Sequence, residues 1–329
     1  MGTSMMENRK VTDSIYLIDA KVFGIPDFTS AYLIVGEELA LVETGPAKSA
    51  PLIMEGIRKV GVDPRDISYL IVTHVHLDHG GGAGTLVKEM PRAKVVVHEK
   101  GARHMVDPSK LVKSSKKVFG PLIDEWYGEV LPIEEGRMMP VKDGDIINLG
   151  KGQRLRMIDS PGHANHHICI YSENEGVLFT GDAVGIYLSD SQAQALVPTT
   201  PPPEFDPDIN IETIRGFFDL DLRLLCFSHF GCTEKVNQTL SKGIEWLMKW
   251  KDTVSEMLET NASLQEITWR FRQDARVLLG PNKKTDALHR WVMEHHLPMC
   301  ASGYLNYFQR KKGERMQEGM FQKTPTPLS

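Results

Sequence analysis

Cysteine is scarce in this sequence, and its placement excludes the closed metal sites that cysteines commonly build. The chain has four among 329 residues, and no two of them show the short spacing of a zinc finger or of a redox Cys-x-x-Cys motif. We therefore expect reduced thiols that pack as small apolar side chains: Cys169, Cys226, Cys232 and Cys300.

Long apolar runs are also absent. No segment approaches the roughly 20 apolar residues that cross a bilayer, and the N-terminal residues lack the apolar core of a signal peptide. We find neither a glycine-rich phosphate loop nor a nucleic-acid-binding module. These absences predict a cytoplasmic protein that binds a small-molecule substrate, with neither a membrane nor a nucleic acid as a partner.

The overall composition is that of a globular protein. Hydrophobic residues make up 41% and charged residues 25% of the chain, and the net charge is −5. Residues 260–329 are rich in Lys and Arg, whereas the part before them is acidic. We interpret the basic segment as a solvated helical surface near an acidic one, with an anionic partner as the alternative.

One stretch concentrates the chemistry of the chain. The apolar run 69–72 is typical of a buried strand, and it leads into His74, His76, Asp78 and His79, which precede three glycines. Because alternate side chains of an extended chain point the same way, His74 and His76 should face a common point, with Asp78 and His79 near a second one. Imidazole and carboxylate groups suit zinc, iron or manganese.

This motif resembles the signature of the metallo-β-lactamase-fold superfamily, especially its hydrolase branches such as glyoxalase II and the lactonases. Three later segments deliver further ligand types in the order that the resemblance requires. The resemblance implies two divalent metal ions, zinc with iron or manganese as alternatives. It also implies seven ligands: His74, His76 and His163 for the first metal, Asp78, His79 and His229 for the second, and Asp182 as the bridge.

Further residues near these motifs are assigned roles as well. Asp78 is expected to orient the attacking hydroxide, and Tyr187 either donates a hydrogen bond to the oxyanion or leaving group or simply packs. Glu43 stands where the family often has an Asp-x-Gly segment, and we expect a supporting acid there. His167 matches a recurrent structural histidine of the family, whereas His166 is assigned no role.

Strand-like and helix-like segments alternate along most of the chain, which predicts an α/β fold. The resemblance implies the particular architecture, an αββα four-layer sandwich with ligands at strand ends. We expect residues 1–259 to form this metallohydrolase domain and residues 260–329 to form an all-helical C-terminal extension. Within the extension, Pro298 is expected to separate two helices.

The extension carries more large apolar residues than solvent exposure allows: Trp269, Phe271, Trp291, Tyr304 and Phe308. Burial of each stabilises the fold by roughly 1.5–3 kcal/mol, so the helices should dock on the body. Our hypothesis is that they cover the metal edge and help to select the substrate, with a homodimer as the alternative. Residues 105–135 and 185–205 are expected to shape the same pocket. In the first of these segments Phe119, Trp126 or Tyr127 would contact substrate, unless it is only a solvated basic helix.

The predicted activity is dinuclear metal-dependent hydrolysis. Two cations about 3.5–4 Å apart share a water, and the resulting bridging hydroxide attacks a carbonyl. An ester, thioester or lactone is the expected substrate class, because the motifs resemble those of glyoxalase II and the lactonases. The alternatives are a phosphoester hydrolase, a mononuclear iron dioxygenase of the persulfide dioxygenase type, and a regulatory binding protein that retains the metal site.

Overall fold

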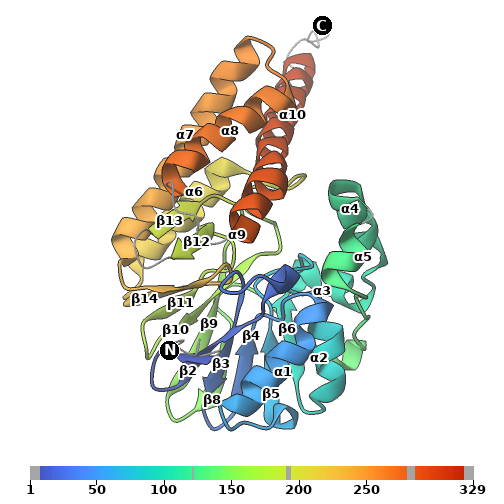
Figure 1. Cartoon of the computed structure of the whole chain (residues 1–329), viewed down its shortest axis with the longest axis vertical. Helices are drawn as coiled ribbons and strands as arrows, with labels where there is room; N and C mark the ends of the chain where they lie inside the picture. The colour runs from blue at the N-terminus through green and yellow to red at the C-terminus, as the bar shows by residue number, and fades with distance from the viewer. Residues whose placement is uncertain (1–7, 121, 190–193, 280–285, 322–329) are drawn as a thin grey trace, which may run out of the picture.

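Two mixed β-sheets face each other at the centre of the computed structural model, which describes residues 8–120, 122–189, 194–279 and 286–321 (Figure 1). Helices cover the outer face of each sheet, so the layers run helix, sheet, sheet, helix. The predicted αββα sandwich with a C-terminal helical region is therefore confirmed.

The first sheet is antiparallel from β1 to β4 and parallel from β4 to β7. Its strands follow chain order: β1 (Asn8–Lys10), β2 (Ile15–Asp19), β3 (Ser30–Val35), β4 (Leu39–Val42), β5 (Ile67–Ile71), β6 (Lys94–His98) and β7 (Met138–Val141). β6, which lies between β5 and the edge strand β7, is buried on both faces, as its run of valines predicts. β5 is the strand expected at 69–72, and the histidine motif follows its carboxyl end.

The second sheet delivers the remaining candidate ligands. Its strands lie in the order β15 (Gly231–Thr233), β14 (Leu224–Phe227), β11 (Val177–Phe179), β10 (Ile168–Ser172), β9 (Gln153–Asp159) and β8 (Ile146–Gly150). All neighbours are antiparallel except β11 and β14, which are parallel. Buried and exposed positions alternate along β8 and the first half of β9, as in half-buried strands. A separate hairpin joins β12 (Ile186–Ser189) to β13 (Gln194–Val197).

The helices divide between the two sheets and the C-terminal region. They are α1 (Ala50–Lys59), α2 (Ala83–Glu89), α3 (Glu99–Val106), α4 (Ser109–Phe119), α5 (Leu122–Tyr127), α6 (Pro207–Gly216), α7 (Val236–Glu259), α8 (Leu264–Leu279), α9 (Asp286–Trp291) and α10 (Leu297–Phe321). The first three pack on the first sheet, and α6 and α7 pack on the second. Local signals explain some of the boundaries: Asp206 caps α6 by accepting hydrogen bonds from the backbone N–H groups of Asp208 and Ile209.

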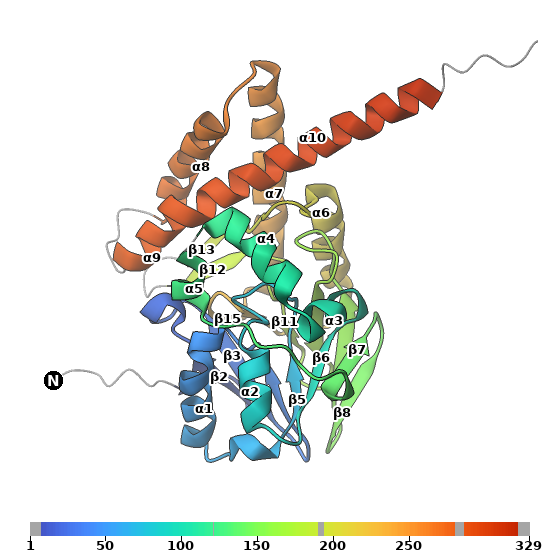
Figure 2. The same cartoon turned by 90° about the vertical axis from the view of Figure 1, so that its right-hand side faces the viewer.

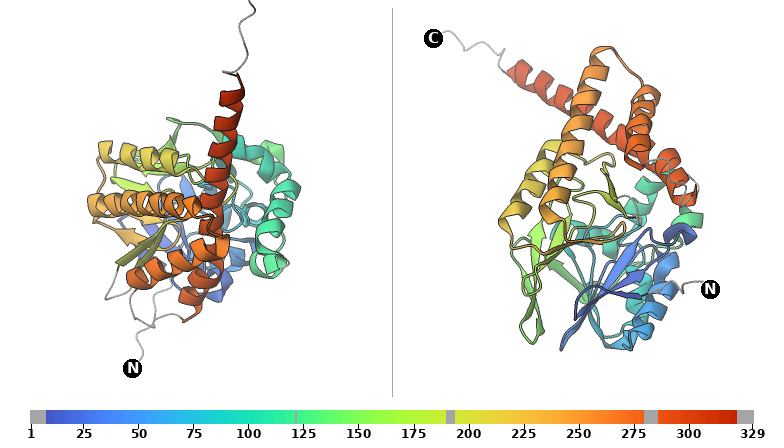
Figure 3. Two further views of the ribbon diagram at one scale, coloured as in Figure 1. Left: turned by 90° about the horizontal axis from the view of Figure 1, so that it is seen from above. Right: turned by 60° about the vertical axis from the view of Figure 1, so that its left-hand side comes forward.

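The C-terminal helices dock on α7 and the β12–β13 hairpin. Phe271 of α8 stacks on Trp250 of α7 with ring centroids 3.9 Å apart, and Tyr304 of α10 donates a hydrogen bond to the Leu247 carbonyl at 2.8 Å. α10 crosses the upper part of the molecule and projects past its body (Figure 2). Seen from above, it passes between α6–α7 on one side and α3–α5 on the other (Figure 3). One expectation fails, because 61% of the Trp269 surface is exposed.

Pro298 does not separate two helices. α9 continues through a π-helical turn, Val292–His296, into α10, where Pro298 is the second residue. A proline fits the first turn of a helix, and the wider turn before it accommodates the missing N–H donor. The domain boundary after residue 259 and the homodimer stay predictions. No helix in the described ranges combines the length and apolarity needed to span a membrane.

Candidate metal centre

The motif histidines lie in a tight loop that follows the carboxyl end of β5, the strand between β4 and β6 in the first sheet. The backbone N–H groups of His79 and Gly80 both donate hydrogen bonds to the carbonyl oxygen of His76, which turns the chain back on itself. A Cβ added to Gly81 would lie 2.2 Å from the carbonyl oxygen of Leu77, so only glycine allows this close approach. The loop therefore aims His74, His76 and His79 inward within six residues.

Residues from both sheets complete two groups of donors. His163 follows β9, Asp182 follows β11, and His229 lies in the turn between β14 and β15. The donor atoms of His74, His76 and His163 lie within 4.8 Å of one another, and so do those of Asp78, His79 and His229. A third such group, His74, His79 and Asp182, shares one member with each of the first two, so all seven predicted ligands are brought together. The first two groups are those that the resemblance implies.

Asp182 joins the two groups through its two carboxylate oxygens. Oδ2 lies 3.5 Å from Nε2 of His163, which belongs to the first group. Oδ1 lies 3.4 Å from Nε2 of His79 and 3.6 Å from Nε2 of His229, which belong to the second. Each oxygen therefore faces a different group, which is the orientation that a bridging carboxylate requires.

The donor atoms fit divalent cations because several of them are buried without a hydrogen bond among the described residues. Nε2 of His74, Nε2 of His79 and Oδ1 of Asp182 are buried and make no hydrogen bond within the described part of the chain. Buried polar atoms are normally paired, so these atoms indicate a ligand that supplies their partner. Imidazole nitrogen with carboxylate oxygen is a donor set that zinc, iron and manganese all accept.

Glu43 supports the candidate ligands His79 and His74 on the side of each ring that carries Nδ1. Its Oε1 lies 3.3 Å from Nδ1 of His79 and accepts a hydrogen bond from Thr73 Oγ1 at 2.5 Å. Thr73 Oγ1 in turn lies 3.0 Å from Nδ1 of His74 and can accept a hydrogen bond from its N–H. Ser228, next to His229, also donates to Glu43 Oε1 at 2.8 Å. The expectation of a supporting acid at this position agrees with this geometry, which leaves Nε2 of each ring free for a metal.

The second sheet supports its ligands in a similar way. His163 places Nδ1 3.0 Å from the carbonyl oxygen of Thr199, so its Nε2 points toward His76 and Asp182. His167 accepts a hydrogen bond from the backbone N–H of Asp182 at 3.1 Å, which is the structural role expected of it. A Cβ on Gly181 would lie 2.4 Å from Nε2 of His167, and its φ of 50° also favours glycine.

The ionisation states of the donors suit cation binding. Burial lowers the pKa values of His74 and His76 well below the ordinary value, so both rings are neutral. Burial also opposes a charge on His79, but the carboxylates of Asp182, Glu43 and Asp78 together raise its pKa. For Asp78 and Asp182 burial favours the protonated acid, yet neighbouring histidines lower both pKa values below the usual range. Ionised carboxylates and a surplus of negative charge around His79 favour a bound cation.

The groups open into a cavity of about 360 Å³. Each region expected to shape the pocket contributes to it: α4 and α5 through Lys110, Leu111 and Tyr127, the 185–205 segment through Ile186, Thr199 and three prolines, and the C-terminal helices through Trp291, His296 and Met299. Among the aromatic candidates of 105–135, Tyr127 lines the cavity, Trp126 is not among the described lining residues, and the Phe119 side chain lies outside the described part.

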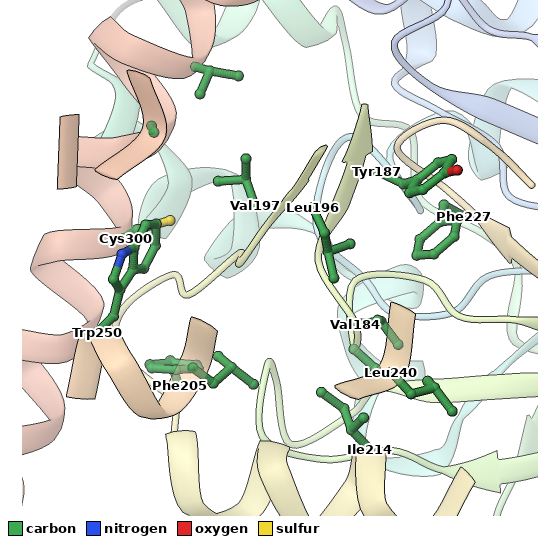
Figure 4. Close-up of a cluster of buried hydrophobic side chains, with 14 of the residues drawn as sticks. Val184, Tyr187, Leu196, Val197, Phe205, Ile214, Phe227, Leu240, Trp250 and Cys300 are labelled. Carbon is green, nitrogen blue, oxygen red and sulfur yellow. The ribbon is translucent and has the colours of Figure 1, made fainter. Parts of the chain in front are cut away.

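Tyr187 is not brought to this cavity. Its ring stacks on Phe227 with centroids 4.7 Å apart, and Figure 4 shows both within the apolar cluster. Successive side chains of a strand point to opposite faces, so Ile186 faces the cavity instead. The structure therefore favours the packing alternative over a role as hydrogen-bond donor to substrate.

Three cavity residues were missed at the sequence level. His104, His166 and His296 all line the cavity, although none belongs to the two donor groups. The His166 ring lies parallel to that of His74, with centroids 6.3 Å apart. His296 is buried in the π-helical turn, with Nε2 2.9 Å from the carbonyl oxygen of Pro198. His166 adjoins a recognisable motif, whereas no local pattern marks His296 as a site residue.

Comparison with known proteins identifies the class of fold and site. A family model described as the metallo-beta-lactamase superfamily matches residues 24–229, so the chain belongs to this superfamily. The metallo-beta-lactamase fold-containing protein ST1585 of Sulfurisphaera tokodaii is 27% identical over 237 residues, which cover 69% of this chain and 85% of that protein. A putative diflavin flavoprotein A 1 of Nostoc sp. is 28% identical over 173 residues, 52% of this chain but only 26% of that protein.

Solved structures show the same fold. The metallo-beta-lactamase family protein TTHA1429 from Thermus thermophilus superposes with a TM-score of 0.67 at 21% sequence identity, covering 92% of this chain and 95% of that one. The structure of ST1585 from Sulfolobus tokodaii gives a TM-score of 0.66, also at 21% identity, over 89% of this chain and 98% of that one. Both alignments reach beyond the region that the family model matches.

Proposed function

We propose that this chain is a dinuclear metal-dependent hydrolase of the glyoxalase II or lactonase type, which cleaves an ester, thioester or lactone. The observation that carries the proposal is the orientation of Asp182, whose two oxygens face two separate groups of donors. Superfamily membership and the buried, unpaired donor atoms support it.

His74, His76 and His163 would hold one cation, and Asp78, His79 and His229 the other, with Asp182 shared. Two divalent cations in such a site supply a water of lowered pKa and polarise a carbonyl oxygen. The chain itself orients the ligands through Glu43 and keeps Asp78 ionised next to the cavity. Asp78 Oδ2 lies 3.5 Å from His229 Nε2, so its carboxylate faces the second group, where it would orient an attacking hydroxide.

The cavity indicates the kind of substrate. Apolar side chains form much of its wall: Leu77, Leu111, Tyr127, Ile186, Trp291 and Met299. Lys110 lies at the exposed side and forms no salt bridge in the described ranges, although its charge acts on nearby Asp107, whereas Glu204 accepts a hydrogen bond from the Asn165 backbone. We therefore propose a substrate with an apolar acyl part and an anionic group beyond the scissile bond.

The test is to load the chain with zinc and to measure its hydrolysis of a substrate panel. The panel contains thioesters, esters, lactones and phosphoesters with matched acyl groups. Turnover of carbonyl substrates that disappears on metal removal and returns with zinc would support the proposal. Turnover of phosphoesters alone would contradict the substrate class, and no turnover of any member would contradict the hydrolase.

Iron and dioxygen chemistry is the second candidate. The similarity of about half of this chain to a putative diflavin flavoprotein favours a redox reaction over hydrolysis, because flavins are redox cofactors. The same histidine and carboxylate donors accept iron. Metal analysis of anaerobically purified protein, followed by oxygen consumption with a reduced flavin or a persulfide as electron donor, separates this candidate from hydrolysis.

A further inference from the structure

Cys226 and Cys232 face each other across the hairpin formed by β14 and β15. The two residues are directly opposite in the antiparallel register, and their Sγ atoms lie 2.8 Å apart without a disulfide between them. Opposite residues of an antiparallel pair have the Cα separation that a disulfide also requires. The sulfurs therefore need to approach by less than about 1 Å to form a bond.

This hairpin carries a candidate metal ligand at its turn. His229 lies in the three-residue turn between Phe227 and Gly231. The Phe227–Gly231 pair is the only strand pair between this turn and the cysteine pair. Tyr32 of the first sheet holds the two sides of the turn, since its hydroxyl lies 2.6 Å from the Phe227 carbonyl and 3.0 Å from the Gly231 carbonyl. The position of His229 thus depends on how firmly the two strands stay together.

The two thiols differ in access. Cys232 is half-buried, whereas Cys226 is fully buried and burial raises its pKa well above the ordinary value. A small oxidant therefore reaches Cys232 first, and Cys226 is the neighbour that can react next. The other two cysteines lack this arrangement: Cys169 and Cys300 are buried, burial raises the pKa of each to about 12, and their thiols donate to backbone carbonyls.

We propose that Cys226 and Cys232 form a reversible redox pair whose disulfide locks the hairpin that carries His229. With hydrogen peroxide, the Cys232 thiolate attacks one peroxide oxygen, the O–O bond breaks, and a sulfenic acid and hydroxide form; the hydroxide takes up the proton that the Cys232 thiol had released and becomes water. The Cys226 sulfur then attacks the Cys232 sulfur and displaces hydroxide, which takes the Cys226 proton and leaves as a second water. Two thiols and one peroxide thus give one disulfide and two waters, and a dithiol reductant reverses the change.

The disulfide affects the metal site by limiting strand separation. Loss of a cation held by Asp78, His79 and His229 requires at least one of these ligands to move away. A cross-link between the strands that lead into the His229 turn restricts that motion, so the oxidised protein should release its metal more slowly. This consequence rests on the proposed metal site, whereas formation of the disulfide does not.

The first experiment counts thiols in the full-length protein treated with peroxide and then alkylated under denaturing conditions. We expect two alkylated cysteines instead of four, a monomeric chain, and a peptide that links Cys226 to Cys232 in the mass spectrum. Cys300→Ala should keep this cross-link and Cys232→Ala should lose it. Four free thiols, a cross-link between chains, or oxidation of Cys232 to a sulfinic acid without pairing would overturn the proposal.

The second experiment measures zinc release to a chelator from oxidised and reduced protein. We expect oxidation to slow release about fivefold, the factor that roughly 1 kcal/mol of local stabilisation gives, in the wild type and in Cys300→Ala but not in Cys232→Ala. Equal release rates in both redox states would refute the lock on His229. A chain that binds no zinc at all would instead refute the proposed function, and the thiol count would still decide whether the pair forms.

Discussion

The carboxylate of Glu43 lies 3.3 Å from Nδ1 of His79, and both side chains are almost completely buried. Through Thr73 and Ser228 the same oxygen also supports His74 and the turn that carries His229. One acid at the end of β4 therefore contacts or supports three of the seven candidate ligands.

Glu43→Gln should weaken zinc binding by about 10- to 100-fold, the usual cost of losing a carboxylate behind a metal-binding histidine. The amide keeps the size of the side chain but removes the charge that fixes the histidine tautomers. Competition with a fluorescent chelator measures the affinity. Glu37→Gln, an exposed change in the same region, is the control and should bind zinc like the wild type.

Asp182→Asn should reduce the metal content from two ions per chain to one or none. Hydrolysis should fall by more than about 100-fold, because loss of a bridging ligand costs more than the 10- to 100-fold lost with a group that only supports a ligand. An amide has one oxygen to offer, so it cannot face both donor groups as the carboxylate does. Plasma emission spectroscopy and turnover of the best substrate provide the measurements, with exposed Asp221→Asn as the control. Two retained metals with full activity would exclude the bridging role.

Lys110→Ala should raise the KM for a thioester with a terminal carboxylate by about twofold to fivefold, the contribution of an exposed ion pair. The KM of the matched neutral thioester should not change. Lys113→Ala is the matched control, because Lys113 lies on the same helix but is not among the described cavity residues. Equal effects of both variants would mean that the helix acts only through its overall charge.

Phe271→Ala should lower the free energy of unfolding by about 3–5 kcal/mol, since it removes a buried ring stacked on Trp250. Trp269→Ala, two residues away and largely exposed, should change it by less than about 0.5 kcal/mol. Urea unfolding followed by circular dichroism measures both. Similar small effects would show that α8 does not depend on its docking face. Removal of the whole extension is a poorer test, because it would expose Trp250.

His296 should make stability fall with acidity. Burial lowers its folded pKa to about 4 from 6.5, so between these values the unfolded chain binds the extra proton and stability declines as pH falls. Relative to His296→Asn, the wild type should lose up to about 1.4 kcal/mol per pH unit across this window and nothing above pH 7. Urea unfolding at several pH values measures the difference. The exposed His289→Asn should follow the wild type; a constant difference between wild type and His296→Asn would contradict the assignment.

The local sequence determined the part of the site that lies in one turn. An apolar strand, alternating histidines and glycines at 80–82 are enough to predict a metal-binding loop, because period-2 geometry and glycine turns act over a few residues. The helices could likewise be predicted from the spacing of apolar residues, because helical periodicity also acts over a few residues. Pro298 was misjudged because a proline is compatible with the first turn of a helix as well as with its end.

Tertiary structure decided which distant residues join that loop and what surrounds it. His163, Asp182 and His229 reach the motif only because the two sheets pack face to face, and Glu43 reaches His79 only because β4 lies beside β5. Such contacts depend on strand order and packing, which no local pattern encodes. For the same reason, only the folded chain turns Tyr187 away from the cavity, brings His296 to its wall and sets Cys226 opposite Cys232.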